Sequence, residues 1–576
     1  MSKQIKLSNL FYCLFFLPFL IQSQSHSLAW VNQIGDIGPD AGNAVKIDQD
    51  GNIVLVGFFR GSSDFDPGPS QKILKSNGSE DIFISKYNSM GELIWARNFG
   101  GRLEDRANQV AIDSFGFVYV TGYFRGQVFF DSTDVRSNFY SKGFGDGFIL
   151  KLDQDGQFEW VKQLGGNLDD IPKSITIDHQ TNILVAGYFQ GKCDFDPSLD
   201  TSELSSKGVN DVFVVKLDED GQFIWVKHVG GRFDDQVSSV LVNADNQIVL
   251  TGNFLDTLDL DPGNGIYKVQ SKGSGDVFVL FLSENGDFIK AGQFASDKVV
   301  NHIGASMDLQ GNIYLTGYYD ARTDFDPGAD SFYIEAQSPV GEIFVVKLNP
   351  DGQLEWAKNL GGDAHDVGLG IGVDAIGNVY TTGCFQGLAD FDPNSGEFIM
   401  EAKGTHNNDV FICKLNASGE FVWARSINGP MNDIGFSLVC NNENQLFVTG
   451  IFSASVLVST NPDTIMLQSR GAEDAFLIGI KQLINHSDDK LTEDLMWKIY
   501  PNPTKDYIII DVEDLEFANS EIILLNQFGK VVFSLKNYKL GDGKELYIPM
   551  EDIPSGHYLL NAKLQYRTFT KSVFKL

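Results

Sequence analysis

Cysteine is scarce in this sequence, with five residues in a chain of 576. Cys13 lies in an apolar segment near the start, and the other four occupy unrelated positions: Cys193, Cys384, Cys413 and Cys440. Such spacing encodes no disulfide framework. Cys384 and Cys413 could meet on neighbouring strands, but we expect buried free thiols.

Histidine is also rare, with eight residues. None forms an HExxH motif or another pair at metal-ligand spacing, and none recurs at a repeated position. A GxSxG elbow, a P-loop and a nucleotide-binding glycine fingerprint are all missing, and no single pair of carboxylates stands out as the acid and base of a glycosidase. The sequence therefore predicts a protein that is not an enzyme, although a site assembled from distant segments would escape a search by spacing.

Positive charge is in the minority, since 44 basic residues face 76 acidic ones and give a formal net charge of −32. Such a surface repels phosphate backbones, which argues against nucleic acid as a partner. It favours cations and cationic surfaces.

Long hydrophobic runs are missing except at the N-terminus. Residues 10–21 read "LFYCLFFLPFLI", a run too short to span a bilayer, with Lys3 and Lys6 before it and "QSQSHS" after it. We interpret residues 1–25 as a secretory signal peptide cleaved near Ser23 or Ser25; a retained membrane anchor is the alternative. No later stretch predicts a transmembrane helix, so the mature protein should be soluble or externally attached.

A repeat of 65 residues fills most of the chain. Trp30, Trp95, Trp160 and Trp225 stand 65 residues apart, Lys290 takes the next position, and Trp356 and Trp423 follow. Each unit contains four strand-like segments, which in one unit begin at residues 173, 182, 211 and 222, and the turn "DEDG" joins the last two as a hairpin. Four short antiparallel strands per repeat are typical of a propeller blade.

Seven blades are predicted, because the second strand and the third strand each recur seven times. The tryptophan strand is offset: its first copy, "LAWVNQI", precedes any complete blade, and none follows "DAFLIGI". The N-terminal strand should therefore complete blade seven and close the ring. We predict an all-β protein, a seven-bladed β-propeller over residues 27–484 closed by an N-terminal strand.

The repeat text, for example "GGNLDDIPKSITIDHQTNILVAGYF", resembles the SBBP repeat named for seven-bladed β-propellers of bacterial surface proteins. The stretch "KAGQFASDKVVNHIGASMD" departs most, because it lacks the tryptophan and the Gly-Gly pair. The resemblance implies an extracellular scaffold, but fold alone does not name a function.

A different domain ends the chain. Residues 485–496 form a polar linker, and residues 497–576 hold six strand candidates that predict a small β-sandwich. The ordered motifs "WKIYPNPTKDYIIIDV", "NQFGKVVFS", "IPSGHYLL" and "KSVFKL" resemble the type A sorting domain of the type IX secretion system. The motif residues are Tyr500, Pro501, Asn502, Pro503, Gly529, Gly556 and Tyr558. This resemblance implies a Bacteroidetes bacterium, Sec export, the type IX machinery as a partner, and a secreted or outer-surface location.

Two sets of aspartates recur. One is the pair in the DFDP-like loops, namely Asp64, Asp66, Asp194, Asp196, Asp259, Asp261, Asp324, Asp326, Asp390 and Asp392. The other lies ten residues after the tryptophan positions, at Asp40, Asp105, Asp170, Asp235, Asp366 and Asp433, with Val300 interrupting it. Both sets should lie at one rim of the ring. The DFDP-like pairs favour turns whose carboxylates accept backbone N–H groups. Calcium is the alternative, and no other cofactor is indicated.

The function predicted is a secreted or cell-surface binding or scaffold protein. Its partner would be a surface, glycan or protein ligand held at the acidic, loop-rich face. An extracellular carbohydrate-active enzyme using carboxylates on that face is one alternative, and a structural spacer or adhesin is another.

Overall fold

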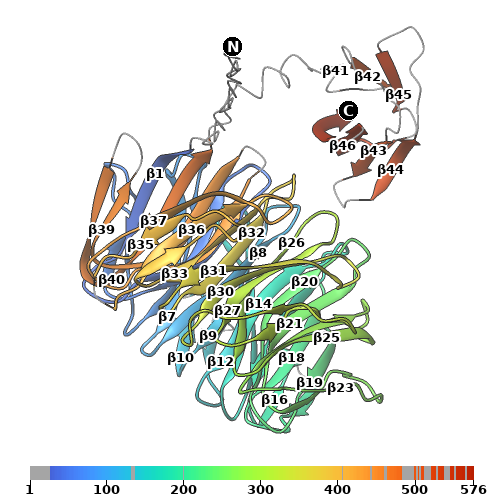
Figure 1. The fold of residues 1–576 in the computed structure, drawn as a ribbon. Coiled ribbons are helices and arrows are strands. Elements are labelled where there is room, and N and C mark those ends of the chain that lie inside the picture. Colours follow the sequence, from blue (N-terminus) through green and yellow to red (C-terminus); the bar gives the residue numbers. More distant parts are fainter. Residues whose placement is uncertain are drawn as a thin grey trace, which may run out of the picture.

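The computed structural model describes residues 26–482, apart from 132–136, 199, 405, 442–443 and 460–463. In the C-terminal region it describes residues 498–500, 504, 507–511, 521–526, 530–536, 545–550, 553–564 and 567–575. All the elements that it assigns there are strands (Figure 1). The segment interpreted as a signal peptide and the linker lie outside the described residues.

Seven antiparallel sheets form the blades, and each has four strands in the order one to four from the axis outward. Blade one comprises β2 (Ala41–Ile47), β3 (Ile53–Phe59), β6 (Asp81–Tyr87) and β7 (Leu93–Gly101). Blade two comprises β8 (Asp105–Ile112), β9 (Val118–Phe124), β12 (Asp146–Leu152) and β13 (Phe158–Gly166). Blade three comprises β14 (Asp170–Ile177), β15 (Ile183–Phe189), β18 (Asp211–Leu217) and β19 (Phe223–Val229). Blade four comprises β20 (Asp235–Val242), β21 (Ile248–Phe254), β24 (Asp276–Leu282) and β25 (Phe288–Ser296). Blade five comprises β26 (Val300–Met307), β27 (Ile313–Tyr319), β30 (Glu342–Leu348) and β31 (Leu354–Gly362). Blade six comprises β32 (Val367–Val373), β33 (Val379–Phe385), β36 (Asp409–Leu415) and β37 (Phe421–Ile427). Blade seven comprises β38 (Ile434–Cys440), β39 (Gln445–Ser459), β40 (Thr464–Gln482) and β1 (His26–Ile34).

Local sequence explains these strands. The second and third strands of each blade are buried along almost their whole length and are rich in Val, Ile, Leu and Phe, as strands covered on both faces must be. The "DEDG" turn forms as predicted: Asp218 accepts N–H groups from Asp220 and Gln222 at 3.0 and 2.7 Å, and Gly221 adopts a φ of 73° that favours glycine. The four-stranded repeat predicted from the sequence is confirmed.

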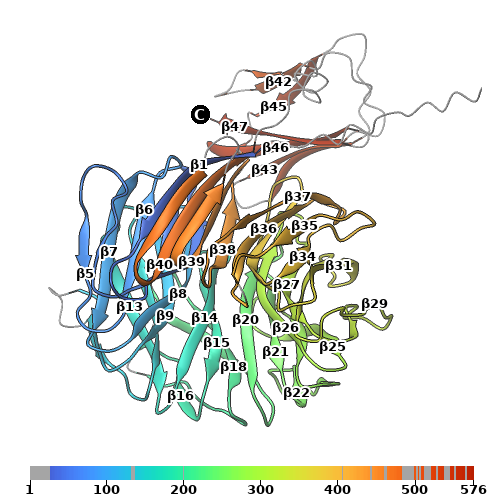
Figure 2. The same ribbon diagram turned by 60° about the vertical axis from the view of Figure 1, so that its left-hand side comes forward.

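The ring closes through the N-terminal strand, as predicted. β1 pairs antiparallel with β40, with Trp30 opposite Gly479 and Ile34 opposite Ala475 (Figure 2). Each innermost strand contacts the next around the axis, and β38 contacts β2. Within the described part of the ring, no edge strand is therefore left open between the first and last blades.

Adjacent blades share hydrophobic cores. One cluster of buried side chains spans each of the seven blade junctions, including the junction of blade seven with blade one. The repeated tryptophan contributes to this packing: a Cβ on Gly91 of blade one would lie 2.5 Å from the Trp30 ring, and the Trp30 indole donates to the carbonyl of Ser89 at 3.0 Å. Only glycine allows so close an approach.

Lys290 replaces the tryptophan without loss of the contact between blades four and five. Its ammonium donates to the carbonyl of Asp351 at 2.7 Å and lies 4.5 Å above the ring of Phe281. In other blades a lysine on the third strand makes the equivalent bond, as Lys86 does to Gln154 at 3.2 Å. The departure seen in the sequence therefore exchanges an aromatic and a lysine between two neighbouring strands.

A feature not predicted from the sequence links neighbouring blades. The connection between the second and third strands forms a short hairpin, and in four cases this hairpin joins the outer strand of the preceding blade to make a six-stranded sheet. These hairpins are β10–β11 (Gln127–Phe129, Asn138–Tyr140), β16–β17 (Lys192–Asp194, Glu203–Ser205), β28–β29 (Thr323–Asp324, Tyr333–Ile334) and β34–β35 (Leu388–Asp390, Ile399–Glu401). Hairpins β4–β5 (Ser62–Asp64, Ile73–Lys75) and β22–β23 (Thr257–Asp259, Lys268–Gln270) form separate two-stranded sheets. The added strands cover edges that would otherwise be open.

Two sheets make up the described C-terminal region. One contains β41 (Lys498–Tyr500), β42 (Tyr507–Asp511) and β45 (Glu545–Pro549). The other contains β43 (Glu521–Asn526), β44 (Val531–Lys536), β46 (Gly556–Leu564) and β47 (Arg567–Lys575). Buried residues from both, including Ile508 and Leu560, form one hydrophobic cluster.

Candidate functional site

The seven innermost strands surround a cavity of about 640 Å³ on the axis of the ring. Every innermost strand contributes residues to its wall. A volume of this size lies within the range of about 300–1,000 Å³ that is usual for small-molecule sites. A second cavity of about 360 Å³ shares Lys173, Ser238 and Ile303 with the first, so the two adjoin.

One position on each innermost strand decides the chemistry of this cavity, and it falls three residues after the repeated aspartate position. Blades one to four place polar side chains there, and blades five to seven place apolar ones. In blade order the residues are Asn43, Asn108, Lys173, Ser238, Ile303, Leu369 and Phe436, and all line the cavity. The channel therefore has a polar sector and an apolar sector that face each other across the axis.

Three polar side chains of this position also tie neighbouring blades together. The amide of Asn43 donates to the carbonyl of Ala107 at 2.8 Å, and the amide of Asn108 donates to the carbonyl of Pro172 at 2.7 Å. The hydroxyl of Ser238 donates to the carbonyl of His302 at 2.9 Å. These bonds hold the polar wall rigid, which favours a preformed site.

Aromatic rings and arginines surround the mouth of the cavity. Phe58, Tyr123 and Tyr188 occupy the same position on three second strands. The Arg106 guanidinium lies 4.3 Å from the Phe58 ring centre, and its Nε is 2.5 Å from Glu80 Oε2. Burial is the main cause that raises the pKa of the Tyr123 and Tyr188 phenols, so both stay neutral donors.

Two lysines extend into the channel without a carboxylate partner among the described residues. Lys46 and Lys173 are both on the cavity wall, and both are exposed to its interior. The surrounding blades displace bulk water, and this desolvation lowers the pKa of each ammonium. Two buried lysines elsewhere are paired with carboxylates: Lys86 Nζ is 2.8 Å from Asp48, and Lys216 Nζ is 2.8 Å from Asp178.

The repeated aspartates do not face the cavity. Together with the acidic residue that starts each third strand they form what we call the carboxylate belt: Asp40, Asp105, Asp170, Asp235, Asp366 and Asp433, and Asp81, Asp146, Asp211, Asp276, Glu342, Asp409 and Asp474. None exposes more than 1% of its surface. Asp105, for example, accepts N–H groups of Gly101 and Arg125 at 2.6 and 3.2 Å, which ties the outer strand of blade one to two strands of blade two. The belt therefore fastens blades at the predicted rim.

Burial raises the pKa of most belt carboxyls despite these hydrogen bonds. The pKa rises to about 7 for Asp40 and Asp170 and to about 8 for Asp105 and Asp433, with loss of hydration as the largest cause. Val300 breaks the belt in blade five, where Asp320 instead accepts the N–H of Val299 at 3.0 Å.

The DFDP-like loops form five copies of one hydrogen-bonded turn. Asp324 accepts N–H groups from Asp326 and Phe332 at 3.3 and 2.8 Å, Asp326 accepts from Gly328 at 2.8 Å, and the Phe325 ring is fully buried. The same three bonds recur at Asp64 and Asp66, Asp194 and Asp196, Asp259 and Asp261, and Asp390 and Asp392. These are the bonds that the turn interpretation requires.

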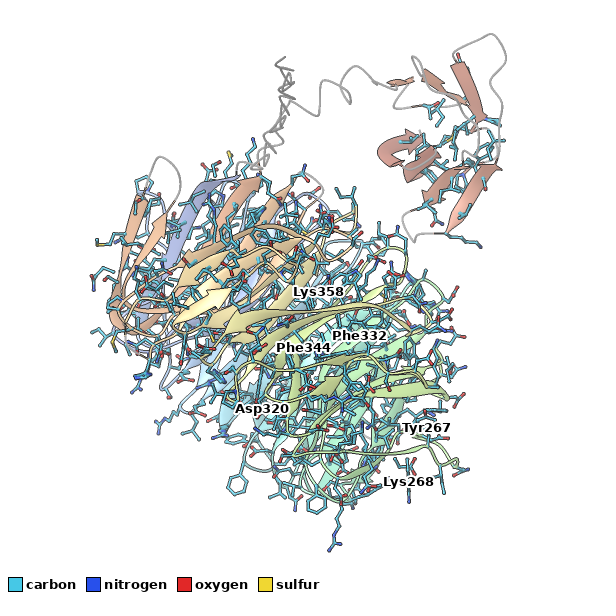
Figure 3. The ribbon with its side chains drawn as sticks, in the orientation of Figure 1. Tyr267, Lys268, Asp320, Phe332, Phe344 and Lys358 are labelled. Atoms are coloured by element: carbon cyan, nitrogen blue, oxygen red, sulfur yellow. The ribbon has the colours of Figure 1, made fainter. Side chains whose placement is uncertain are left out.

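Calcium binding at these loops stays a prediction. Over the described residues, no group of three or more His, Cys, Asp or Glu side chains is arranged to hold a metal ion. The loops also lie away from the axis, as Tyr267 and Lys268 from the blade-four connection illustrate (Figure 3). The loops and the carboxylate belt share one end of the blades, but they form separate networks.

The remaining predicted residues fall in the C-terminal region or among the thiols. Tyr500 ends β41, Gly556 begins β46, and the Tyr558 hydroxyl donates to the carbonyl of Pro554 at 2.7 Å. Pro501, Asn502, Pro503 and Gly529 lie outside the described residues. Cys193, Cys384 and Cys413 are buried free thiols, as expected, and Cys440 is a half-buried one.

Sequence reasoning missed Lys46, Lys173, Arg106 and Tyr123 as candidate site residues. The sequence search followed residues that recur in every repeat, whereas these four residues occupy positions that vary between repeats. Framework positions must recur because every blade needs them, whereas a site on the axis is built once. The change from Asn, Asn, Lys and Ser to Ile, Leu and Phe could have identified the channel wall.

Relatives in sequence span only parts of longer proteins. The chain is 22% identical over 489 residues to an uncharacterized WD repeat-containing protein of Acanthamoeba polyphaga mimivirus, covering 77% of this chain and 32% of that protein. It is 26% identical over 176 residues to a regulatory protein, FlaEY, of Caulobacter vibrioides, covering 30% of this chain and 18% of that protein. The chain thus spans less than a third of the length of these relatives.

Solved structures give weaker likenesses. A protein of unknown function from Bacteroides caccae aligns with a TM-score of 0.30 at 11% identity, over 61% of this chain and 92% of that one. A gluconolactonase from Xanthomonas campestris aligns with a TM-score of 0.27 at 12% identity, over 63% of this chain and 90% of that one. At TM-scores this low, the two structures add nothing to the assignment of fold or activity.

Family models match both parts of the chain. The beta-propeller repeat model, SBBP, matches residues 94–123 and 159–188, and the secretion system C-terminal sorting domain matches residues 498–575. The sorting domain indicates type IX export to the cell surface or beyond. Across the described residues, no helix has the length and apolar composition to cross a membrane. The chain is a seven-bladed β-propeller in which two segments match the beta-propeller repeat SBBP, and it carries a secretion system C-terminal sorting domain.

Proposed function

We propose that this protein is a secreted or surface-attached binding protein whose ligand enters the central channel. One observation carries the proposal: the side chains that differ between blades converge on a single axial cavity of about 640 Å³. The repeated residues around the cavity, in the carboxylate belt and the hydrophobic clusters, hold the blades together. A preformed cavity with a few convergent polar groups is the usual form of a small-molecule or glycan site.

The chain organisation fits this role. We propose that residues 1–25 direct export from the cytoplasm, that residues 27–484 are the binding unit, and that residues 485–496 link it to a sorting domain at 497–576. The type IX machinery would then be the partner of the C-terminal domain, and the ligand the partner of the ring.

A glycan and polysaccharide array probed with the purified chain tests the proposal. Leu369→Trp adds bulk on the apolar wall and should abolish binding, because the larger ring fills the space a ligand needs. Leu388→Trp is the matched control, since Leu388 lies on the outer hairpin β34 and is 61% exposed. Both variants should melt within a few degrees of the parent chain. Equal binding by both variants would contradict a site in the channel.

A carbohydrate-active enzyme is the second candidate. Asp169 and Glu473 line the cavity together with Arg125, so two carboxylates lie on the wall of the proposed site. Incubation of the same polysaccharide panel with the chain separates the two functions. A product peak that Asp169→Asn removes would favour the enzyme, and bound but uncleaved glycan would favour the binding protein.

A further inference from the structure

The two unpaired lysines point to the charge of the ligand. Lys46 and Lys173 line the cavity with exposed side chains, and neither forms an ion pair with a described carboxylate. Asp169 and Glu473 lie on the same wall, and Asp169 Oδ1 is 4.0 Å from the Arg125 guanidinium. The chain as a whole has a net charge of −32 and 76 acidic residues, so an ion-pair partner for these lysines could readily come from the protein itself. Both side chains are exposed within the cavity, so they are available to pair with an anionic ligand.

Paired lysines in the same ring show what a structural role looks like. Lys86 and Lys216 each contact an aspartate at 2.8 Å and also donate to a backbone carbonyl of the next blade, at 3.2 Å in both cases. Lys414 donates to Gln482 at 2.7 Å. Lys46 and Lys173 make none of these contacts and do not join blades. A ligand anion would give them the partner that the fold does not provide.

The two lysines project from different depths of the channel wall. Lys173 falls three residues after its belt aspartate and Lys46 falls six after its own. At a rise of about 3.3 Å per residue, this separates their Cα atoms by about 10 Å along the strand direction. A ligand with negative groups spaced along its length can pair with both lysines.

The opposite wall adds a second requirement. Ile303, Leu369 and Phe436 form the apolar sector that faces Lys173 and the asparagines. A sugar ring has an apolar C–H face and a hydroxyl-bearing edge, and it suits a channel divided in this way. Tyr123 and Tyr188, which also line the cavity, offer further flat surfaces for such faces.

We propose that the channel binds the end of an acidic oligosaccharide whose uronate carboxylates pair with Lys173 and Lys46. The apolar sector contacts the sugar faces, and the polar sector accepts and donates hydrogen bonds to hydroxyls. The acidic exterior repels a polyanion laid across the surface, so recognition is confined to a chain end that reaches the lysines. This inference rests on the proposed function, because it names the ligand class of the same cavity.

Calorimetry with trigalacturonate and its neutral methyl ester, using the full chain, tests this assignment. We expect the acid to bind and the ester to bind much more weakly. Lys173→Gln and Lys46→Gln should each raise the Kd for the acid by about tenfold or more, as expected when a charged hydrogen bond is lost. Lys268→Gln, an exposed lysine on the outer hairpin β23, should leave the Kd unchanged.

The folded state gives an independent readout. Because the two lysines are unpaired, their replacement by glutamine should not lower the melting temperature of the free protein. A fall of several degrees would show that they are paired within the fold and would overturn the proposal. A sulfated trisaccharide in place of the uronate distinguishes the anionic group: tight binding of the sulfate with none of the uronate would also overturn the assignment.

The outcomes separate this inference from the proposed function. If a neutral glycan binds and only Leu369→Trp blocks it, the channel is the site but its ligand is not acidic. If trigalacturonate binds equally to the parent, Lys173→Gln and Leu369→Trp, both proposals fail.

Discussion

Raising the pH from about 5 to about 8 should destabilise the ring, because the carboxylate belt is buried. Each belt carboxyl with a raised pKa holds its proton longer in the folded chain than in the unfolded chain. Its contribution to stability is complete below the ordinary aspartate pKa near 4 and is lost as the pH rises through the folded value. For Asp40, Asp105, Asp170 and Asp433 that value is about 7 or 8, so the loss falls between about pH 4 and pH 8.

The magnitude follows from proton linkage. For each proton that the folded state binds in excess of the unfolded state, the free energy of unfolding falls by about 1.4 kcal/mol per unit rise in pH. The backbone N–H groups around each carboxyl favour its charged form, so we count roughly two net protons for the whole belt near neutral pH. The slope is then about 3 kcal/mol per pH unit. For a ring of roughly 450 residues, with an unfolding entropy of about 2.1 cal/mol/K per residue, this lowers the melting temperature by about 3 °C per pH unit.

Scanning calorimetry at two salt concentrations checks this reasoning. Repulsion among the exposed acidic side chains also grows with pH, but about 1 M salt shortens the Debye length to about 3 Å and largely screens it. Buried carboxyls are screened much less, so a falling melting temperature should persist at high salt. If the melting temperature in 1 M salt stays constant or rises with pH, ionisation of the belt carboxyls does not lower the free energy of unfolding, and the prediction is wrong.

The other predictions concern the ring, its loops and its export. Deleting residues 27–34 should lower the melting temperature far more than deleting residues 485–576, because it removes the outer strand of blade seven and exposes an edge; similar small shifts from both deletions would contradict closure by β1. If calcium binds, it should raise the melting temperature, and Asp324→Asn with Asp326→Asn should remove part of that rise; calorimetry without heat at millimolar calcium would end this hypothesis. Removing residues 498–575 should keep the chain from reaching the medium or cell surface in a host with the secretion system, while the ring still folds; immunoblots of cell fractions would check this, and normal export would contradict it.

Much of the fold was predictable because the repeat places the same local signals in every unit. Turn residues such as those of "DEDG" act within a few positions of the chain, and the tryptophan period reports which strands are equivalent. Counting these signals was enough to assign seven blades and to give β1 to the last blade. Even the replacement of tryptophan by Lys290 left the count intact, because Phe281 and Lys290 exchange roles across one pair of strands.

The hairpins that extend neighbouring sheets were not predictable in the same way. Their pairing partner is the end of the preceding outer strand. In three cases it is a Gly-Gly pair, as when Val128 lies opposite Gly101, and in the fourth it is Ala295 and Ser296. That edge becomes available only when two blades pack side by side. The sequence marked the loop through its DFDP-like text, but it could not say that the loop completes another blade.

The sequence by itself determined the blade repeat, the closing strand and the sorting domain, because each depends on patterns within one segment or on a count of segments. Only the tertiary structure decided which of the many carboxylates are buried and where the varying side chains meet. Seven strands far apart in sequence bring one position each to a common axis. The cavity, with Lys173 and Lys46 on its polar side and Phe436 on its apolar side, exists because the ring closes, and no spacing along the chain encodes it.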